Sequence, residues 1–283
     1  MASAHGLPDA ATIRRMRAAH ACAADAFDAT PEPAGPEAWG WQGRTLGRPV
    51  TTANGPAWLR LMASRTDQIV DTYWTGNVDA QLQLPSSIPR PQLRAWHDWT
   101  DHGWAYRAEL HDSARGQPLA DTAVLASTPH PPTAWWTDLR AALDIIAAVP
   151  TQRISVRPEF LTWAMPHYLG LPIKPPPIDE WTTAHGDLHY AKLCAPDLTI
   201  LDWEGWGRAP AGYDAATLHC RSLTSPMAAA RIRTELAAIL ETPAGRLAEL
   251  AVIAELLHAA DQGAHPELVN HLRHRAKTLR DTT

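Results

Sequence analysis

One stretch in the second half of the chain contains most of the residue types that could do chemistry. Residues 185–207 read HGDLHYAKLCAPDLTILDWEGWG and place acids and histidines around the apolar run 198–201, which predicts a buried strand. Asp187 precedes this run and Asp202 follows it directly. Two such carboxylates could hold a hydrated Mg²⁺ ion against phosphate oxygens, or Asp187 could accept a proton from an attacking hydroxyl. Lys192 lies between them, where this chemistry would favour a side-chain oxygen.

The elements that must position this stretch begin with a sheet-rich segment. Apolar residues recur at helical spacing over residues 9–28, and prolines and a glycine then end that helix. Asn54-Gly55 is typical of a two-residue hairpin turn, and alternating residues over 93–110 predict a second hairpin that turns near 101–103. The intervening residues 66–84 have room for one short helix.

From about residue 132 the apolar pattern becomes helical. Trp135, Trp136, Leu139, Leu143 and Ile146 predict one buried face, and a proline-rich loop at 172–177 leads into the chemical stretch. Further helices are expected over residues 215–222, 227–240, 244–262 and 266–280. The order predicts an α+β protein of two lobes. We expect a helical arm and linker at 1–36, a small antiparallel lobe at 37–112 and a helical lobe at 113–283, with the connection near 109–113.

Composition excludes several classes of protein. The net charge of −5 gives no general basic field, so nucleic acid is not an expected partner. No segment reaches the roughly 18 apolar residues of a membrane-spanning helix, and the N-terminus does not read as a targeting signal, so no membrane partner is expected either. Three widely spaced cysteines argue against a disulfide framework and a CxxC metal site, which favours a reducing cytoplasm.

Three blocks occur in an order that matches a known family. His185-Gly186-Asp187-Leu188-His189 is followed by Ile200-Leu201-Asp202-Trp203-Glu204 and then by Pro210-Ala211-Gly212-Tyr213-Asp214. This pattern resembles the aminoglycoside phosphotransferase family of the protein-kinase-like fold, which includes choline-kinase-like enzymes. The resemblance is specific over residues 184–218; elsewhere it depends on a sheet-rich small lobe preceding a helical large lobe.

The resemblance implies a role for each matching residue in the large lobe. Asp187 matches the catalytic-loop aspartate that orients the acceptor hydroxyl, and Asp202 matches the acid that binds Mg²⁺ on the ATP phosphates. His185 would brace the catalytic loop, and Asp214 would hold that loop from the start of a helix.

In the small lobe, Arg60 falls where the family places a phosphate-binding lysine, and its acidic partner would come from Asp67, Asp71 or Asp79. Gly43, with Gly40 and Gly47, would form the loop over the phosphates, and Glu109 would contribute to the nucleotide site at the connection between the lobes. The cofactors implied are ATP, or GTP, and Mg²⁺.

Two positions depart from the family pattern. The family continues HGDLHxxN, and its asparagine oxygen binds a second metal, but Lys192 occupies this position. A lysine ammonium only donates, and at contact distance it would repel each unit of metal charge by about 4 kcal/mol at an effective dielectric constant near 20. Lys192 could instead neutralise phosphate charge itself. The second departure is Arg60, because its planar guanidinium differs from a point-charge ammonium.

Three functions therefore remain open. The first is an ATP-dependent phosphotransferase that modifies a hydroxyl of a small molecule or a peptide. Asp187 would be its base, Asp202 its metal ligand, and Lys192 and Arg60 its phosphate-binding residues. The acceptor would lie in a cleft lined by the C-terminal helices. Acids there, such as Glu235, Glu249, Glu255 and Asp261, could attract a cationic substrate or, as expected first, simply form a solvated face. The second is a pseudoenzyme that binds a nucleotide, a peptide or a partner enzyme. The third is a metal-dependent hydrolase that uses His185, Asp187 and His189 as ligands. The N-terminal helix is expected to pack on the protein or to form a dimer contact.

Overall fold

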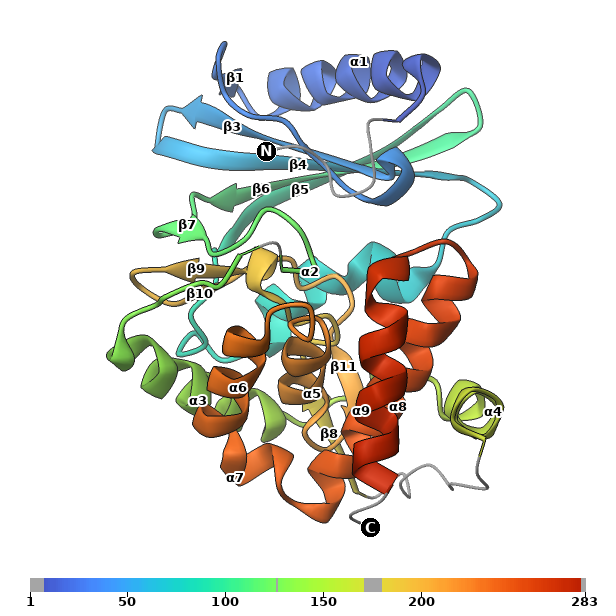
Figure 1. Cartoon of the computed structure of the whole chain (residues 1–283). Helices are drawn as coiled ribbons and strands as arrows, with labels where there is room; N and C mark the ends of the chain where they lie inside the picture. The colour runs from blue at the N-terminus through green and yellow to red at the C-terminus, as the bar shows by residue number, and fades with distance from the viewer. Residues whose placement is uncertain (1–7, 126, 171–179, 281–283) are drawn as a thin grey trace.

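A computed structural model describes residues 8–125, 127–170 and 180–280 (Figure 1). A small antiparallel sheet is followed by a larger, mostly helical part, as the sequence predicted. The proline-rich loop expected at 172–177 lies outside the described residues. None of the described helices combines the length and apolar character needed to cross a lipid bilayer.

The small sheet contains both predicted hairpins. Its order is β1 (Thr30–Pro31), β3 (Thr45–Thr52), β4 (Gly55–Arg65), β6 (Trp104–Asp112) and β5 (Leu93–Asp101), and β2 (Ala38–Trp39) also pairs with β3. Thr52 pairs with Gly55 across the first turn and Asp101 with Trp104 across the second. His102 and Gly103 of the second turn both have positive φ, as a type I′ hairpin turn requires. Pairing of β4 with β6 places Arg60 directly opposite Glu109.

The N-terminal helix α1 (Ala10–Ala26) covers the outer face of this sheet (Figure 1). Asp9 caps its start, because one carboxylate oxygen accepts from the backbone nitrogens of Ala11 and Thr12. Met16 and Ala23 of α1 are fully buried in one apolar core with residues of β3, β4 and β6. The described part of segment 1–36 therefore packs on the small lobe.

Helix α2 (Asp71–Gln83) lies between the sheet and the helical lobe (Figure 1). It donates to the sheet through Asn77, and its Ala80 packs in the core of the helical lobe. Ala80, Leu84 and Ile88 belong to the core of the large lobe, not to the core beneath α1. The Pro89 carbonyl accepts a 2.7 Å hydrogen bond from the Ile200 backbone nitrogen. The chain from α2 to Pro89 is thus anchored in the large lobe before it returns to the sheet as β5.

The large lobe consists of helices around short antiparallel strands. The predicted apolar face of α3 (Thr133–Ala147) is buried, whereas α4 (Pro158–Leu169) was not predicted, because prolines begin and interrupt it. The helix expected at 227–240 is divided at Leu236 into α6 (Pro226–Glu235) and α7 (Ala237–Leu240). The remaining elements are α5 (Tyr213–Cys220), α8 (Pro243–Asp261), η4 (Pro266–Leu268), α9 (Val269–Arg280), and the strands β7 (Gln117–Pro118), β8 (Trp181–Ala184), β9 (Leu193–Ala195), β10 (Thr199–Ile200) and β11 (Gly207–Pro210).

Candidate functional site

The loop that carries Asp187 is fixed at both ends. It leaves β8 at His185, and Asp214 in the first turn of α5 accepts from the backbone nitrogens of His185 (2.7 Å) and Gly186 (3.0 Å). Gly186 has a φ of 88°, and a Cβ there would lie 2.1 Å from the Ser155 Oγ. The loop therefore requires glycine at 186, and Asp214 makes the contacts expected of a residue that holds it.

His185 connects the Asp187 loop to the segment that ends in Asp202. Its Nε2 is 2.9 Å from the Leu201 carbonyl, and its Nδ1 accepts from the Asp187 backbone nitrogen at 3.3 Å. Burial lowers the pKa of His185 to about 4, so the ring is neutral at neutral pH. Both ring nitrogens are occupied. His185 therefore has no nitrogen left to bind a cation, and one of the three metal ligands that the metal-hydrolase hypothesis expected is not available.

Lys192 lies between the two aspartates. It ends the short helix η3 (Tyr190–Lys192), and its Nζ is 2.7 Å from Asp187 Oδ2 and 3.1 Å from Asp202 Oδ2. Burial opposes its charge, but the carboxylates of Asp187 and Asp202 outweigh this and raise the pKa of Lys192. The positively charged ammonium of Lys192 therefore connects the carboxylates of Asp187 and Asp202.

A second cation on Asp187 was missed by the sequence analysis. Arg221, directly after α5, donates from Nη2 to Asp187 Oδ1 at 2.9 Å. Although burial favours the neutral acid, Lys192 and Arg221 hold the pKa of Asp187 well below its usual range. Asp187 is thus ionised and each of its oxygens has a fixed donor. The sequence offered no signal for Arg221, because it reaches the loop only through the packing of α5.

In the small lobe, the acidic partner of Arg60 differs from all three expected residues. Arg60 Nη1 donates to Glu109 Oε2 at 3.0 Å, a cross-strand pair between β4 and β6. Asp79, one of the expected partners, pairs with Arg153 instead, and Asp67 is exposed. The side chain of Asp71 is not among those that the structure describes. Helix α2 contributes Asn77, whose amide donates to the same Glu109 oxygen at 2.8 Å.

Glu109 also differs from its predicted place. It is buried inside β6, which continues to Asp112, so the connection between the lobes begins later than residue 109. Burial raises its pKa, but Arg60 outweighs this and the net pKa of Glu109 is lowered. Glu109 therefore contacts Arg60, and it is connected to Asp202 through that arginine. We expected Glu109 in the connection between the lobes, but it lies within the sheet.

The expected glycine loop has a packing explanation. Gly43 has a φ of 72°, and an added Cβ would lie 2.6 Å from Pro8 Cγ and 2.8 Å from Thr12 Cγ2. A Cβ on Gly47 would likewise meet the Trp58 ring at 2.6 Å. The absence of side chains at Gly43 and Gly47 is thus explained by contacts with α1 and Trp58, and it gives no evidence for a phosphate-binding loop.

Arg60 also reaches the large lobe. Its Nη2 pairs with Glu204 and lies 3.6 Å from Asp202 Oδ1, and Arg44 pairs with the other carboxylate oxygen of Glu204. Asp202 itself has a positive φ of 63°, and the next backbone nitrogen, of Trp203, donates to Asn77 at 2.9 Å. Residues from both lobes therefore meet at Asp202 and Glu204.

The residues present fit one Mg²⁺ ion better than two. Asp202 Oδ1 is buried and has no hydrogen-bond donor, so this oxygen could take a cation. The second position of the family is filled by the Lys192 ammonium, which has no lone pair to offer. Lys192 and Arg60 both lie close to Asp202, and a metal ion there would have to tolerate their charges.

The acids that could have attracted a cationic acceptor do not gather in one place. Glu235 pairs with Arg140 and Arg231, and Asp261 accepts from the Tyr168 hydroxyl at 2.8 Å. Glu255 alone of the four lies near Asp187, and it accepts from the Tyr213 hydroxyl. The suggested acidic cleft is therefore not formed, and all four acids have partners within the protein.

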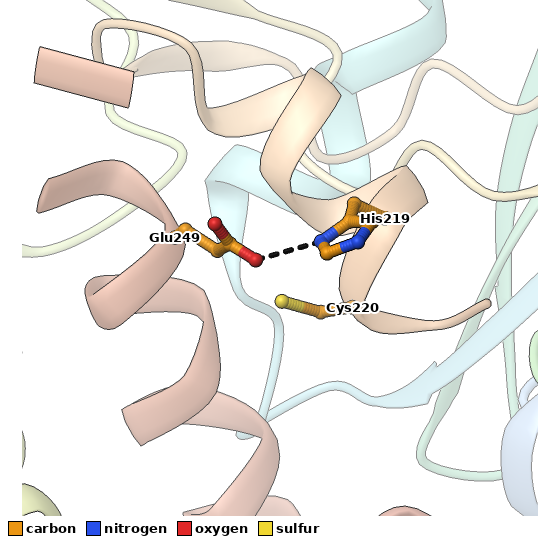
Figure 2. Close-up of side chains that lie close together, drawn as sticks. All are labelled: His219, Cys220 and Glu249. Atoms are coloured by element: carbon orange, nitrogen blue, oxygen red, sulfur yellow. Dashed lines mark hydrogen bonds and ion pairs between the residues drawn. The ribbon is translucent and has the colours of Figure 1, made fainter. Parts of the chain in front are cut away.

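Glu249, the fourth of these acids, belongs to a buried cluster with His219 and Cys220 (Figure 2). It is the one group of three or more metal-type ligands that converge within the described residues. Glu249 accepts from His219 at 2.6 Å and from Arg275 through both oxygens at 2.8 Å. Burial raises the pKa of the Cys220 thiol well above its usual value. With an arginine already paired to its carboxylate, the cluster joins α5, α8 and α9 and is not a metal site.

Glu255 gives the site a measurable pH dependence. Burial raises its pKa from 4.5 to about 7, against the opposing effects of Tyr213 and Arg221. The folded state therefore binds more protons than the unfolded state between these values, and the stability contributed by protonated Glu255 is lost as the pH rises through 7. Glu255→Gln should increase the free energy of unfolding by up to about 3 kcal/mol at pH 8 and leave it unchanged near pH 4.

Urea unfolding of both proteins at several pH values measures this difference. Glu159→Gln, at an exposed position on α4, serves as the control. A difference between Glu255→Gln and the wild type that does not vary with pH would contradict the assignment.

Comparison with solved structures decides the fold. A thermostable mutant of aminoglycoside phosphotransferase APH(4)-Ia, in a ternary complex with ADP and hygromycin B, matches with a TM-score of 0.65 and 11% identity over 92% of this chain and 97% of that chain. The chain has the aminoglycoside phosphotransferase fold. A further APH(4)-Ia structure gives a TM-score of 0.63 at 12% identity, covering 96% of this chain and 98% of its own.

The phosphotransferase fold extends to a kinase of another substrate class. A microcompartment-associated aminopropanol kinase matches with a TM-score of 0.51 and 12% identity, over 93% of this chain and 95% of that chain. No protein-family model and no curated protein matches the sequence. At these identities the likeness shows the fold, which confirms the predicted two-lobe kinase-like architecture of this divergent chain.

Proposed function

We propose that the chain is an ATP-dependent phosphotransferase in which Lys192 takes the place of the second metal ion. The observation that carries this proposal is the position of the Lys192 Nζ, within 3.1 Å of both Asp187 and Asp202. Phosphoryl transfer depends on positioning and charge neutralisation more than on covalent help from the protein. A fixed ammonium at this point can supply one of the positive charges that the reaction needs.

Each residue then has a definite task. Asp187 orients the acceptor hydroxyl, and Lys192 and Arg60 face the phosphates. His185 and Asp214 keep the loop in place. A Mg²⁺ ion at Asp202 would neutralise phosphate charge when bound. Because Lys192 and Arg221 lower the pKa of Asp187, this carboxylate serves mainly to position the hydroxyl and is a weak base in the ground state.

A hydroxyl of a small molecule is the acceptor we propose, and ATP the donor. Two of the matching APH(4)-Ia structures are ternary complexes of hygromycin B with ADP or AMP-PNP, which supports an adenine nucleotide and a small acceptor in this fold. The acids of the C-terminal helices do not come together to form a negatively charged site for a cationic acceptor, so they give no reason to choose an aminoglycoside.

A pseudoenzyme is the second candidate, and the charge balance of the site favours it. Asp187, Asp202, Glu204 and Glu109 are matched by Lys192, Arg60, Arg44 and Arg221. A site that is already neutral attracts Mg²⁺ weakly. The protein would then bind a nucleotide, a peptide or a partner enzyme without turnover.

Thermal unfolding with ATP separates these candidates from a protein with no nucleotide site. We expect ATP to raise the melting temperature without Mg²⁺, because Lys192 supplies a cation, and to raise it further with Mg²⁺. At 100 times the dissociation constant the stabilisation is about 2.7 kcal/mol. No shift under either condition would contradict both nucleotide-binding candidates, and a shift without any phosphoryl transfer to water or to a panel of hydroxyl compounds would favour the pseudoenzyme.

A further inference from the structure

Glu204 bridges two arginines of the small lobe. One of its carboxylate oxygens pairs with Arg44, just before β3, and the other pairs with Arg60 in β4. The side chains of Glu204 and Arg60 are 14% and 11% exposed, while Arg44 is 38% exposed. A single anion thus holds two guanidinium groups together at the boundary between the lobes.

The backbone of Glu204 is held in place by neighbouring elements. A Cβ added to Gly76 of α2 would lie 2.0 Å from the Glu204 carbonyl oxygen, so α2 and this segment are in direct contact. The same carbonyl accepts from Arg153 Nη2 at 3.3 Å. The carboxylate is therefore presented to the arginines by a fixed main chain.

This arrangement is the one in which arginines bind phosphate. Guanidinium groups donate in pairs to separate oxygens of one anion, and carboxylate and phosphate share this geometry. The bridge also lies beside Asp202, whose Oδ1 is 3.6 Å from Arg60 Nη2. The anion between Arg44 and Arg60 is therefore close to the residue proposed to hold a metal against nucleotide phosphate.

We propose that Glu204 competes with a nucleotide phosphate for Arg44 and Arg60, and that Arg44 is a second phosphate-binding residue. The ligand is a nucleoside triphosphate, and the inference rests on the proposed nucleotide site. When Glu204 is displaced, Arg60 keeps its pair with Glu109. Arg44 has no other ion pair among the described residues, so its charge becomes available to the phosphate.

Two other roles for Glu204 make different predictions. If the bridge only joined the lobes, removal of its charge would lower stability without changing nucleotide affinity. If Glu204 were a metal ligand, its loss would weaken the binding of ATP with Mg²⁺ and leave binding without Mg²⁺ unaltered. The competitor role is distinguished by tighter anion binding in the absence of any metal.

Calorimetric titration of the full chain in EDTA tests the proposal with ATP and with inorganic tripolyphosphate. Glu204→Gln should bind both ligands about tenfold more tightly than the wild type, because two arginines are released. Adding Arg44→Gln to this variant should abolish the gain. Glu37→Gln, which removes an ion pair with Arg17 elsewhere in the small lobe, should leave both affinities unchanged.

Unchanged or weaker binding in Glu204→Gln, including no binding of either ligand to any variant, overturns the inference. A gain that survives Arg44→Gln overturns the role of Arg44. Phosphoryl transfer is assayed separately on the same proteins. The affinity gain without transfer would overturn the proposed catalytic function and leave the competition established, whereas transfer with no affinity gain would do the reverse.

Discussion

Replacing Asp187 by asparagine should lower the rate of phosphoryl transfer by roughly 10²–10⁴-fold and leave ATP binding largely intact. The carboxylate accepts from Lys192 and Arg221 and is still 38% exposed, so it is both fixed and accessible to an acceptor hydroxyl. An amide keeps the shape of the side chain, but it loses the charge that orients the hydroxyl. A steady-state transfer assay and a separate ATP titration measure the two effects.

The control for this variant is Asp197→Asn, which changes an exposed aspartate in the turn between β9 and β10. Circular dichroism of Asp187→Asn should show a folded protein, because Asp214 and His185 hold the loop independently of the carboxylate. Retained turnover in a folded Asp187→Asn protein would refute the assigned role of Asp187.

The second large effect concerns Lys192. Lys192→Ala should reduce transfer on the order of a hundredfold or more at any Mg²⁺ concentration, because it removes a cation at the phosphates. Lys192→Asn restores the oxygen ligand of the family pattern. We expect its activity to be low at limiting Mg²⁺ and to recover as the concentration rises, as a second metal replaces the ammonium.

Measuring the rate against Mg²⁺ concentration for the wild type and both variants distinguishes the two candidate functions. A wild type that responds to one ion and a Lys192→Asn variant that responds to two would match the proposal. Higher activity in Lys192→Asn than in the wild type at every Mg²⁺ concentration would mean that Lys192 blocks catalysis, as the pseudoenzyme hypothesis requires.

The sequence predicted the site best where its residues are close along the chain. The HGDLH and LDWE blocks are separated only by the short helix η3 and the hairpin of β9 and β10, so local chain geometry suffices to bring Asp187 and Asp202 to one point. The hairpins were equally local, although the first turn lies one residue earlier than the predicted Asn54-Gly55. Thr52 pairs with Gly55, so Ala53 and Asn54 form the turn, and Gly55 follows it with a φ of 93°. The second turn is formed by His102 and Gly103, as expected. The mismatch at Lys192 was visible, but its contact with both acids required the structure.

The ion pairs between distant segments could not be predicted in this way. The pairing of Arg60 with Glu109 depends on the register of β4 against β6, and Arg221 reaches Asp187 only because α5 packs beneath the loop. Arg44 and Glu204 meet across the two lobes although they are 160 residues apart in sequence, and nothing in the sequence around Arg44 indicates this contact. Helix α4 was missed because Pro158 begins it and Pro166 lies within it, and both read as loop signals.

The anchoring of α2 and Pro89 in the large lobe has a mechanical consequence. The chain passes between the sheet and the helical lobe three times: after Arg65, before Leu93 and after Asp112. Three chain segments thus join the sheet and α1 to the helical lobe. The sheet therefore cannot rotate freely about a single hinge. This connectivity leaves small rotations of the two lobes about these three connections, together with side-chain movement of Arg44 and Glu204, as the motions by which the proposed nucleotide would be admitted.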